Sequence, residues 1–292
     1  MSENAFGDGA VIITGSSRGI GRAVAHTLSA EGVPVVVNGR DREVVDATVG
    51  EIVSRGGEAV GVPGSAADTG VAQMLLDAGL ESFGDVGALI CCAGIAEPAG
   101  SSILDVADDD WEELIDAHLT STFRACRVVA PHLVDRAAGA IVNTSSYAYL
   151  GCYGGTGYAA AKGAVNSLTL AMAAELAEFG VRANVVAPGA RTRLSSGDGY
   201  LEQIETLHRR GLLSDAMYQG SLDPAPAEYV ARLYAYLVSD SSRGVTGRIF
   251  AGSGCFLGEF EYTHPSVLAW RDHATEEPWR IDEIARFVTG PE

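Results

Sequence analysis

The sequence predicts an α/β protein built as a doubly wound, seven-stranded parallel sheet with helices on both faces. Short apolar segments alternate with longer amphipathic segments along most of the 292 residues. The short segments are almost entirely apolar, as strands covered on both faces are. Such alternation gives parallel strands joined by right-handed crossovers. A single domain of about 250 residues is an ordinary size for this class.

The elements follow in order from short apolar runs and helical periodicity. The first strand is expected at 10–14, and after a glycine-rich turn a helix is expected at 20–30, ending before Gly32. A second strand at 33–37 tolerates Pro34 because proline can begin a strand. The other expected strands are 58–62, 88–91, 140–143, 181–186 and 247–251. The other expected helices are 41–55, 68–83, 107–136, 156–180 and 225–239, with 195–220 irregular or helical.

The C-terminal part of the chain differs in composition from the rest. Residues 1–257 contain the strand–helix alternation, whereas 258–292 contain proline, many charges and two of the three tryptophans. This extension is too aromatic for a disordered tail. We expect one domain over 1–257 and an extension over 258–292 that packs on the core or on a neighbouring subunit.

Charge and hydropathy limit the partners. The formal net charge is −18, and such a surface repels phosphate backbones and anionic lipids, so neither nucleic acid nor a membrane surface is expected as a partner. No apolar run reaches the ~18 residues that span a bilayer, and the N-terminus lacks the pattern of a signal peptide. We therefore expect a cytoplasmic protein.

The cysteines form neither a disulfide framework nor a metal site. Their number is odd, no pair is spaced C-x-x-C, and no histidine lies at zinc-binding spacing. This pattern is typical of a reducing compartment and predicts no bound metal. The five cysteines are Cys91, Cys92, Cys126, Cys152 and Cys255.

A glycine-rich turn lies between the first strand and the first helix. Its sequence is Thr-Gly-Ser-Ser-Arg-Gly-Ile-Gly, with glycines at 15, 19 and 21. Such a turn lets the backbone approach a pyrophosphate and directs free N–H groups and the positive helix end toward it. The spacing is not G-x-G-x-x-G, but a strand before and a helix after are the context that phosphate binding requires.

A second group of polar residues follows the fifth strand. The strand runs into Ser145 and Ser146, and Tyr158 and Lys162 lie four residues apart on one face of the next helix. An ammonium beside a phenol stabilises phenolate and would lower the tyrosine pKa from ~10. Tyr158 is then usable as a general acid or base.

Together these motifs resemble the short-chain dehydrogenase/reductase family, and the resemblance covers about residues 9–254. It implies a Rossmann fold and transfer of a hydride between nicotinamide and a ketone or secondary alcohol. It also implies that Tyr158 exchanges the proton, that Lys162 binds the nicotinamide ribose and tunes Tyr158, and that Ser146 orients the carbonyl. The strand motif favours Ser146, whereas the usual serine-to-tyrosine spacing favours Ser145.

The resemblance also implies the cofactor contacts. NAD-preferring members carry an acid at the end of the second strand, where this chain has Gly39 followed by Arg40. Arg40 and Arg18 can pair with a 2′-phosphate, so NADP(H) is favoured over NAD(H). Thr192 would bond the carboxamide. The full expected set is Gly15, Ser17, Arg18, Gly19, Ile20, Gly21, Arg40, Ala93, Gly94, Tyr158, Lys162, Pro188, Gly189 and Thr192.

Three stretches depart from the family pattern. Cys91 and Cys92 replace an Asn-Asn pair, and Ser65 lies where an adenine-contacting Asp is usual. His118 replaces the catalytic Asn, and either a proton-relay role or passive packing fits it.

The substrate and the assembly are less defined by the sequence. Apolar and aromatic residues around Tyr147–Tyr153 suit a cyclic ketone or polyketide, and arginines near 191–210 would suit an acyl thioester. The resemblance implies a homodimer or homotetramer. Two alternatives to a ketoreductase or alcohol dehydrogenase remain: a cofactor-binding homologue with little turnover, and a redox-neutral dehydratase or isomerase.

Overall fold

A computed structural model of the chain describes residues 6–98, 101–153, 155–192, 198–261 and 265–289. Its sheet has eight strands in the order β3-β2-β1-β4-β5-β6-β7-β8. All pairings from β3 to β7 are parallel, and β8 pairs with β7 antiparallel. The strands are β1 (Ala10–Thr14), β2 (Val35–Gly39), β3 (Ala59–Pro63), β4 (Val86–Cys91), β5 (Gly139–Thr144), β6 (Val181–Gly189), β7 (Ile249–Ser253) and β8 (Phe256–Phe260).

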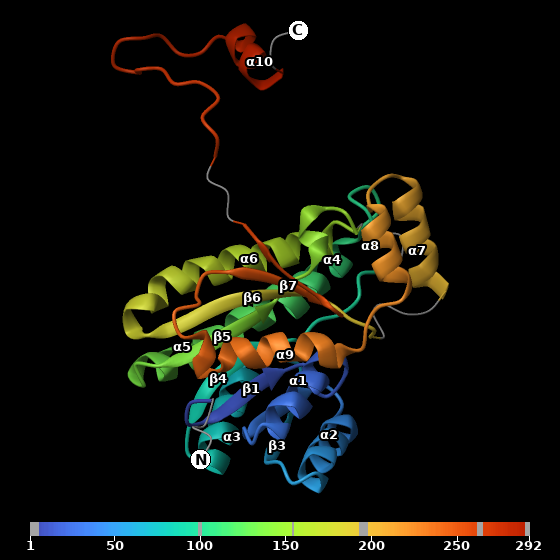
Figure 1. Cartoon of the computed structure of the whole chain (residues 1–292), viewed down its shortest axis with the longest axis vertical. Coiled ribbons are helices and arrows are strands. Elements are labelled where there is room, and N and C mark those ends of the chain that lie inside the picture. The colour runs from blue at the N-terminus through green and yellow to red at the C-terminus, as the bar shows by residue number, and fades with distance from the viewer. Residues whose placement is uncertain (1–5, 99–100, 154, 193–197, 262–264, 290–292) are drawn as a thin grey trace. The chain divides into compact units, whose positions relative to one another are not determined.

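Helices cover both faces of the sheet (Figure 1). One apolar core joins the strands to α1 (Gly19–Ala30), α2 (Arg42–Ser54) and α9 (Ala227–Val238). A second core lies on the other face, against α3 (Val71–Phe83), α5 (Ser121–Asp135) and α6 (Gly157–Leu176). The doubly wound Rossmann architecture is therefore confirmed.

Local sequence accounts for how the first crossover begins and ends. Every residue of β1 is buried, and all but Thr14 are apolar. Helix α1 ends at Ala30, and Gly32 follows with φ +81°. The Asp41 carboxylate then accepts the N–H groups of Glu43 and Val44, which would otherwise be free in the first turn of α2.

The expected long helix over 107–136 is interrupted. It consists of α4 (Asp108–Ile115), a π-helical turn η1 (Asp116–Thr120) and α5. Ser121 Oγ donates to the Ala117 carbonyl and Thr122 Oγ1 to the His118 carbonyl, each at 2.7 Å. These bonds satisfy carbonyls in the widened turn.

Two further differences concern the C-terminal half. The expectation of seven parallel strands misses β8, an exposed edge strand that returns after a hairpin with Gly254 at φ +53°. β8 lies partly beyond the expected domain boundary at 257 and belongs to the sheet. The stretch expected to be irregular or helical contains α7 (Asp198–Arg209) and α8 (Asp215–Leu222).

The chain divides into a compact unit over Met1–Phe260 and a second unit over Glu261–Glu292. The second unit contains α10 (Ile281–Thr289) and is organised around Arg271. The Arg271 guanidinium lies 3.7 Å from the centre of the Trp279 ring and 3.2 Å from the Glu283 carboxylate. That the extension packs on the core or a neighbouring subunit stays a prediction. No helix among the described residues is long and apolar enough to cross a membrane.

Candidate active site

The glycine turn after β1 is anchored by the end of β2. Gly15 has φ +65°, and its N–H donates to Asn38 Oδ1 at 3.2 Å. A Cβ on Gly21 would lie 2.5 Å from the Gly15 carbonyl oxygen, so glycine at 21 lets α1 approach the turn closely. The turn therefore has the tight geometry that brings backbone N–H groups to a phosphate.

Asn38 is a residue that sequence reasoning missed. It is 1% exposed, and its Nδ2 donates to the carbonyls of Val62 at 3.0 Å and Gly64 at 3.1 Å. Asn38 thus ties the ends of β1, β2 and β3 together beneath the turn. The sequence feature that could have revealed Asn38 is a polar residue at the end of an otherwise apolar strand.

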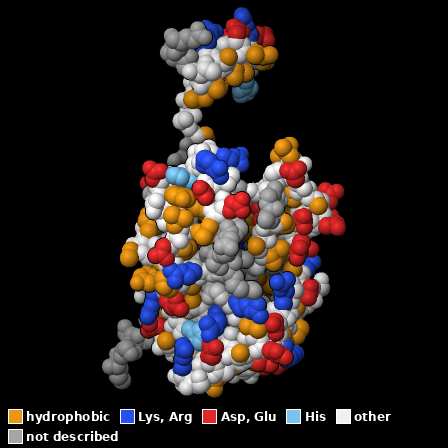
Figure 2. All heavy atoms as spheres, turned by 90° about the vertical axis from the view of Figure 1, so that its right-hand side faces the viewer, with side chains coloured by type: hydrophobic (Ala, Val, Ile, Leu, Met, Phe, Trp, Pro, Cys, Tyr) orange, Lys and Arg blue, Asp and Glu red, His pale blue; other side chains and the backbone are white. Residues whose placement is uncertain are grey.

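A cavity of about 310 Å³ lies between the turn, the end of β2 and the loop after β4. Arg18, Arg40 and Asp41 line it, together with Gly15, Ser17 and Gly94. Arg18 pairs with Asp41 at 3.1 Å, and about half of each side chain is exposed. Figure 2, which views the side on which α7 and α8 lie in Figure 1, shows basic side chains among acidic ones. The positive charge of Arg18 and Arg40 is therefore confined to the cavity and does not extend over this face.

The remaining expected cofactor contacts lie around the same turn. A Cβ on Gly15 would be 2.6 Å from Ala93 Cα, so the loop after β4 touches the turn. A Cβ on Gly19 would be 3.6 Å from Thr192 Cγ2. Pro188 and Gly189 end β6 and pair with Gly252 and Ser253 of β7. Arg193, one of the arginines near 191–210 that would suit an acyl thioester, lies outside the described residues.

Tyr158, Lys162 and Ser146 meet at the carboxyl end of β5. The Ser146 side chain lies near Tyr158 and acts to lower the pKa of its phenol. The Lys162 ammonium lies 5.6 Å from the centre of the Tyr158 ring and donates to the Thr144 carbonyl at 2.9 Å. Lys162 is 4% exposed, so its charge lies in a nearly dry environment.

The two serines after β5 differ in their surroundings. Ser145 is 1% exposed, and its Oγ donates to the Lys162 carbonyl at 3.2 Å. Ser146 Oγ accepts the N–H of Ala148 at 3.2 Å and faces Tyr158. Ser145 therefore braces α6, and Ser146 is the serine placed to hold a substrate oxygen.

Burial dominates the ionisation of the two catalytic candidates. It raises the pKa of Tyr158; the hydrogen bond from Ser146 opposes this rise, and the charge of Glu97 adds to it. This direction is opposite to the lowering expected from Lys162, because burial penalises the phenolate and the ammonium is directed at Thr144. Burial also lowers the pKa of Lys162 to about 8.

His118 lies in the π-helical turn beside Tyr158. The two ring centres are 4.9 Å apart with the rings nearly perpendicular. His118 Nε2 is 3.0 Å from the Ile95 carbonyl oxygen, and its buried Nδ1 has no hydrogen-bond partner among the described residues. Burial first, and then the charge of Lys162, hold its pKa well below the usual range, so the ring is neutral.

The cysteines that replace the family's Asn pair pack as thiols. The Cys91 thiol is buried beside Cys126, and this contact and burial raise its pKa. Cys92 accepts a hydrogen bond from Thr144 Oγ1 at 3.5 Å, and burial raises its pKa to about 11. Both are protonated at neutral pH and fill space beneath the site.

These residues fit a bound dinucleotide. The cavity lies against the N-terminal end of α1, whose first-turn N–H groups have no partner within the helix, and two guanidinium groups line it. Arg40 forms no ion pair within the described ranges, which leaves it available to a phosphate. In that same part of the chain, no cluster of His, Cys, Asp or Glu could hold a metal ion.

The loop after β5 contains aromatic residues that pack against α7 and α8. Cys152 and Tyr153 pack against a small apolar cluster of α7, α8 and the turn between them. Tyr153 OH hydrogen-bonds Ser221 Oγ at 3.2 Å, which joins the loop to α8. Two polar side chains nearby have partners: Arg191 lies 2.6 Å from Asp223, and His208 Nε2 lies 2.9 Å from Asp215.

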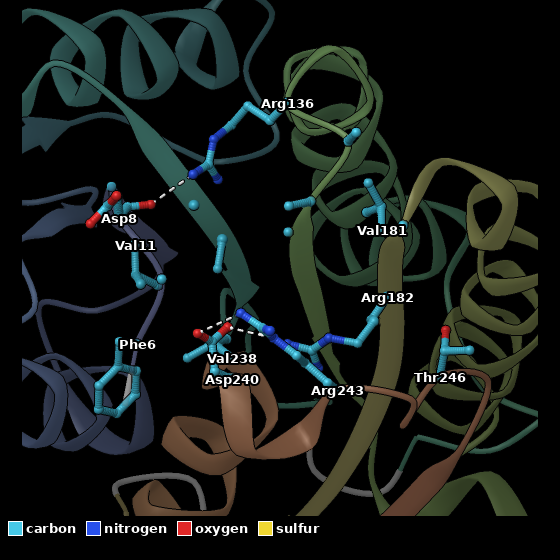
Figure 3. Close-up of a pocket in the computed structure, with 18 of the residues that line it drawn as sticks. Phe6, Asp8, Val11, Arg136, Val181, Arg182, Val238, Asp240, Arg243 and Thr246 are labelled. Atoms are coloured by element: carbon cyan, nitrogen blue, oxygen red, sulfur yellow. Dashed lines mark hydrogen bonds and ion pairs between the residues drawn. The ribbon is translucent and has the colours of Figure 1, made fainter. Parts of the chain in front are cut away.

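A larger cavity, of about 760 Å³, lies at the amino ends of the strands (Figure 3). Arg136, Arg182 and Arg243 line it, and each is occupied by protein partners. Arg136 donates to the Asp8 carbonyl at 2.8 Å, and Arg243 pairs with Asp240 at 2.9 Å. The arginines of this larger cavity are therefore engaged by the protein. The smaller cavity and the group formed by Ser146, Tyr158 and Lys162 lie at the opposite, carboxyl edge of the sheet.

Comparisons with known proteins give the family. The family described as "short chain dehydrogenase" matches residues 9–195. The 3beta-hydroxysteroid dehydrogenase 1 of Eggerthella lenta is 35% identical over 85% of this chain and 93% of its own length. A 3-oxoacyl-[acyl-carrier-protein] reductase of Synechocystis sp. is 37% identical over 61% of this chain and 72% of its own.

A solved short chain dehydrogenase from Mycobacterium avium superposes with a TM-score of 0.77 at 31% identity. The match covers 96% of this chain and 93% of that one. The chain belongs to the short-chain dehydrogenase/reductase family. It is an oxidoreductase of a family that binds a nicotinamide cofactor, acts on small molecules and is commonly oligomeric.

Proposed function

We propose that this protein is an NADP(H)-dependent oxidoreductase that interconverts a ketone and a secondary alcohol. The observation that carries the proposal is the meeting of Ser146, Tyr158 and Lys162 at the carboxyl end of β5, on the same edge of the sheet as the glycine turn. A hydroxyl, a phenol and an ammonium that lie close together can orient a carbonyl and exchange one proton with its oxygen.

When bound, the nicotinamide supplies the hydride for reduction and accepts it in oxidation. In reduction, Ser146 holds the carbonyl oxygen, and the Tyr158 O–H bond breaks as its proton passes to that oxygen. The product would be an alcohol, and Tyr158 would be left as phenolate. Lys162, whose ammonium lies 5.6 Å from the centre of the Tyr158 ring, would hold the ribose hydroxyls. His118, neutral and with Nδ1 free of partners among the described residues, relays the proton that restores Tyr158.

The charges around the cavity favour NADP(H). Arg18 and Arg40 line it, and the residue that ends β2 is Gly39 rather than an acid. The Arg18–Asp41 pair is half exposed, so its exchange for an Arg18–phosphate contact has a small cost. Guanidinium groups bind phosphate oxygens with paired hydrogen bonds.

The substrate side favours an apolar cyclic ketone or alcohol. Tyr153 and the α7–α8 cluster present aromatic and apolar groups, and Arg191 is engaged by Asp223. The hydroxysteroid dehydrogenase likeness agrees with a cyclic substrate. An acyl thioester, whose class the reductase likeness suggests, is the second candidate.

We further propose a cytoplasmic homodimer or homotetramer. All five cysteines are free, as in a reducing compartment. Trp111 of α4 and Phe123 of α5 are 38% and 47% exposed, which suits helix pairing between subunits.

The cofactor proposal is tested by titrating the protein with NADPH and with NADH while nicotinamide fluorescence is followed. We expect NADPH to bind at least ~10-fold more tightly, because a 2′-phosphate gains charge-assisted hydrogen bonds. Arg40→Ala should weaken NADPH binding ~10-fold and leave NADH binding unchanged. Arg55→Ala, at the exposed far end of α2, is the matched control.

The outcomes separate the functional alternatives. Tighter binding of NADH would overturn the choice of cofactor. Binding of neither dinucleotide by folded protein would contradict an oxidoreductase role. NADPH binding without oxidation by any cyclic ketone or 3-oxoacyl thioester, in a panel of both, would favour a homologue with little turnover.

A further inference from the structure

The loop after β4 reaches the first turn of the catalytic helix α6. The Glu97 Oε1 atom accepts the N–H of Gly157 at 3.0 Å and that of Tyr158 at 3.4 Å. The N–H groups of a first helical turn have no partner within the helix. Thr156, at the N-cap position, makes no side-chain capping bond. A carboxylate about 60 residues away in the sequence therefore caps α6 at the residue that carries the phenol.

The backbone next to the cap is shaped to admit this carboxylate. Gly155 has φ +77°, and a Cβ there would overlap Glu97 Oε2. A Cβ at Gly157 would still clear Oε1, at 3.6 Å. Glycine at 155 is thus required both by its left-handed backbone and by the space that Glu97 occupies.

The same carboxylate places a negative charge near a buried phenol. Tyr158 is faced by Ser146 after β5, His118 from η1, Lys162 from α6 itself, Tyr234 from α9, and Glu97. His118 is neutral, and the Lys162 ammonium is bonded to Thr144. The charge of Glu97 disfavours phenolate and so raises the pKa of Tyr158 further than burial alone.

We propose that Glu97 is a positioning residue of the active site: it holds the first turn of α6, and with it Tyr158, and supplies a fixed negative charge beside the phenol. This inference rests on the proposed role of Tyr158 as the proton donor. The Glu97 charge widens the pH range in which Tyr158 is protonated. Carbonyl reduction uses this protonated form of Tyr158. Oxidation, which uses the phenolate, is displaced to more alkaline pH.

The test separates two effects of Glu97, its hydrogen bonds to the first turn of α6 and its negative charge. Glu97→Gln keeps an acceptor oxygen and removes the charge, whereas Glu97→Ala removes both. Glu112→Gln removes a charge from an exposed position on α4 and is the matched control. Ionisation of Tyr158 is measured by the ultraviolet difference absorbance of phenolate, each protein against its own Tyr158→Phe derivative, so no substrate is needed.

We expect Glu97→Gln to lower the midpoint of Tyr158 ionisation by about 0.5–1 pH unit and Glu112→Gln to leave it in place. The alkaline limb of kcat/KM for reduction of cyclohexanone by NADPH should move down with it. Glu97→Ala should also lower the melting temperature, which Glu97→Gln should largely preserve.

Two results would overturn the inference. An unchanged midpoint in Glu97→Gln would remove the electrostatic role, and a melting temperature of Glu97→Ala equal to that of the wild type would remove the holding role. If Glu97→Ala does not fold, the capping role stands and Glu97→Gln still decides the charge. The titration needs no turnover, so a failure of the proposed oxidoreductase activity is recognised separately.

Discussion

The two ends of the sheet use arginine in opposite ways. At the amino ends, a cavity of about 760 Å³ is lined by arginines that protein groups satisfy. Arg182 donates to the carbonyls of Leu237 at 2.7 Å and Ser239 at 3.1 Å. At the carboxyl ends, the cavity is about 310 Å³, and Arg40 has no ion-pair partner among the described residues.

If the proposed site at the carboxyl ends is the functional one, the cavity with a guanidinium group that is unpaired among the described residues, rather than the larger cavity, is the one that binds the ligand. In parallel sheets ligands bind at the carboxyl ends of the strands, where helix N-termini present free N–H groups. At the amino ends the guanidinium groups stabilise the fold by bonding backbone carbonyls. Substitutions at the two ends should therefore separate activity from stability.

The largest effect is expected from Tyr158→Phe. Without the phenolic proton, kcat for ketone reduction should fall about 10²- to 10⁴-fold, which is the usual contribution of general acid catalysis. NADPH binding and the melting temperature should change little. Steady-state kinetics and fluorescence titration measure these, and an activity within ~10-fold of the wild type would remove Tyr158 from the mechanism.

At the opposite end, Arg182→Met should act on stability alone. It leaves buried carbonyls of Leu237 and Ser239 without their donor, which should lower the free energy of unfolding by about 3 kcal/mol. Arg243→Met is the control, since the Arg243 side chain is 77% exposed and its pair with Asp240 contributes less than about 1 kcal/mol. Denaturant unfolding and kcat/KM together check this. Loss of NADPH binding in Arg182→Met at a temperature where it is folded would show that the two ends are coupled.

Lys162→Met should abolish turnover and yet stabilise the unliganded protein. Burial lowers the pKa of Lys162 to about 8 from 10.5, so the folded state releases its proton more readily than the unfolded state. Below pH 8 the lysine destabilises the fold by its full amount, and this penalty diminishes as pH rises from about 8 to 10.5. The variant should be more stable by about 1–3 kcal/mol at pH 7, with the difference shrinking at alkaline pH. Unfolding at pH 7 and pH 10 tests it, and a variant less stable at pH 7 would contradict the sign.

The smallest effect is expected at His118. His118→Phe keeps a ring against Tyr158 but removes Nδ1, so kcat should fall about 10-fold if a proton passes through this atom. His118→Asn restores hydrogen bonding and should retain more activity than the Phe variant. The measurement is kcat across pH. If both variants are as active as the wild type, His118 is a packing residue.

Much of the fold and part of the site followed from the sequence. A buried strand such as Ala10–Thr14 could be predicted because four of its five residues are apolar. β8 did not, since Phe256 and Leu257 are 55% and 67% exposed and an edge strand has little pattern. The π-helical turn at His118 was invisible because Ser121 and Thr122 read as ordinary helical residues.

By itself, the sequence determined the order of strands and helices, the glycine turn and the four-residue spacing of Tyr158 and Lys162. These depend on local backbone preference and periodicity, which neighbouring residues settle. Tertiary structure decided that Ser146 rather than Ser145 faces Tyr158, that Asn38 anchors the turn and that Glu97 caps α6. It also decided that the pKa of Tyr158 is raised. Contacts between residues distant in the sequence, and the burial that controls ionisation, exist only once the sheet has brought its carboxyl ends together.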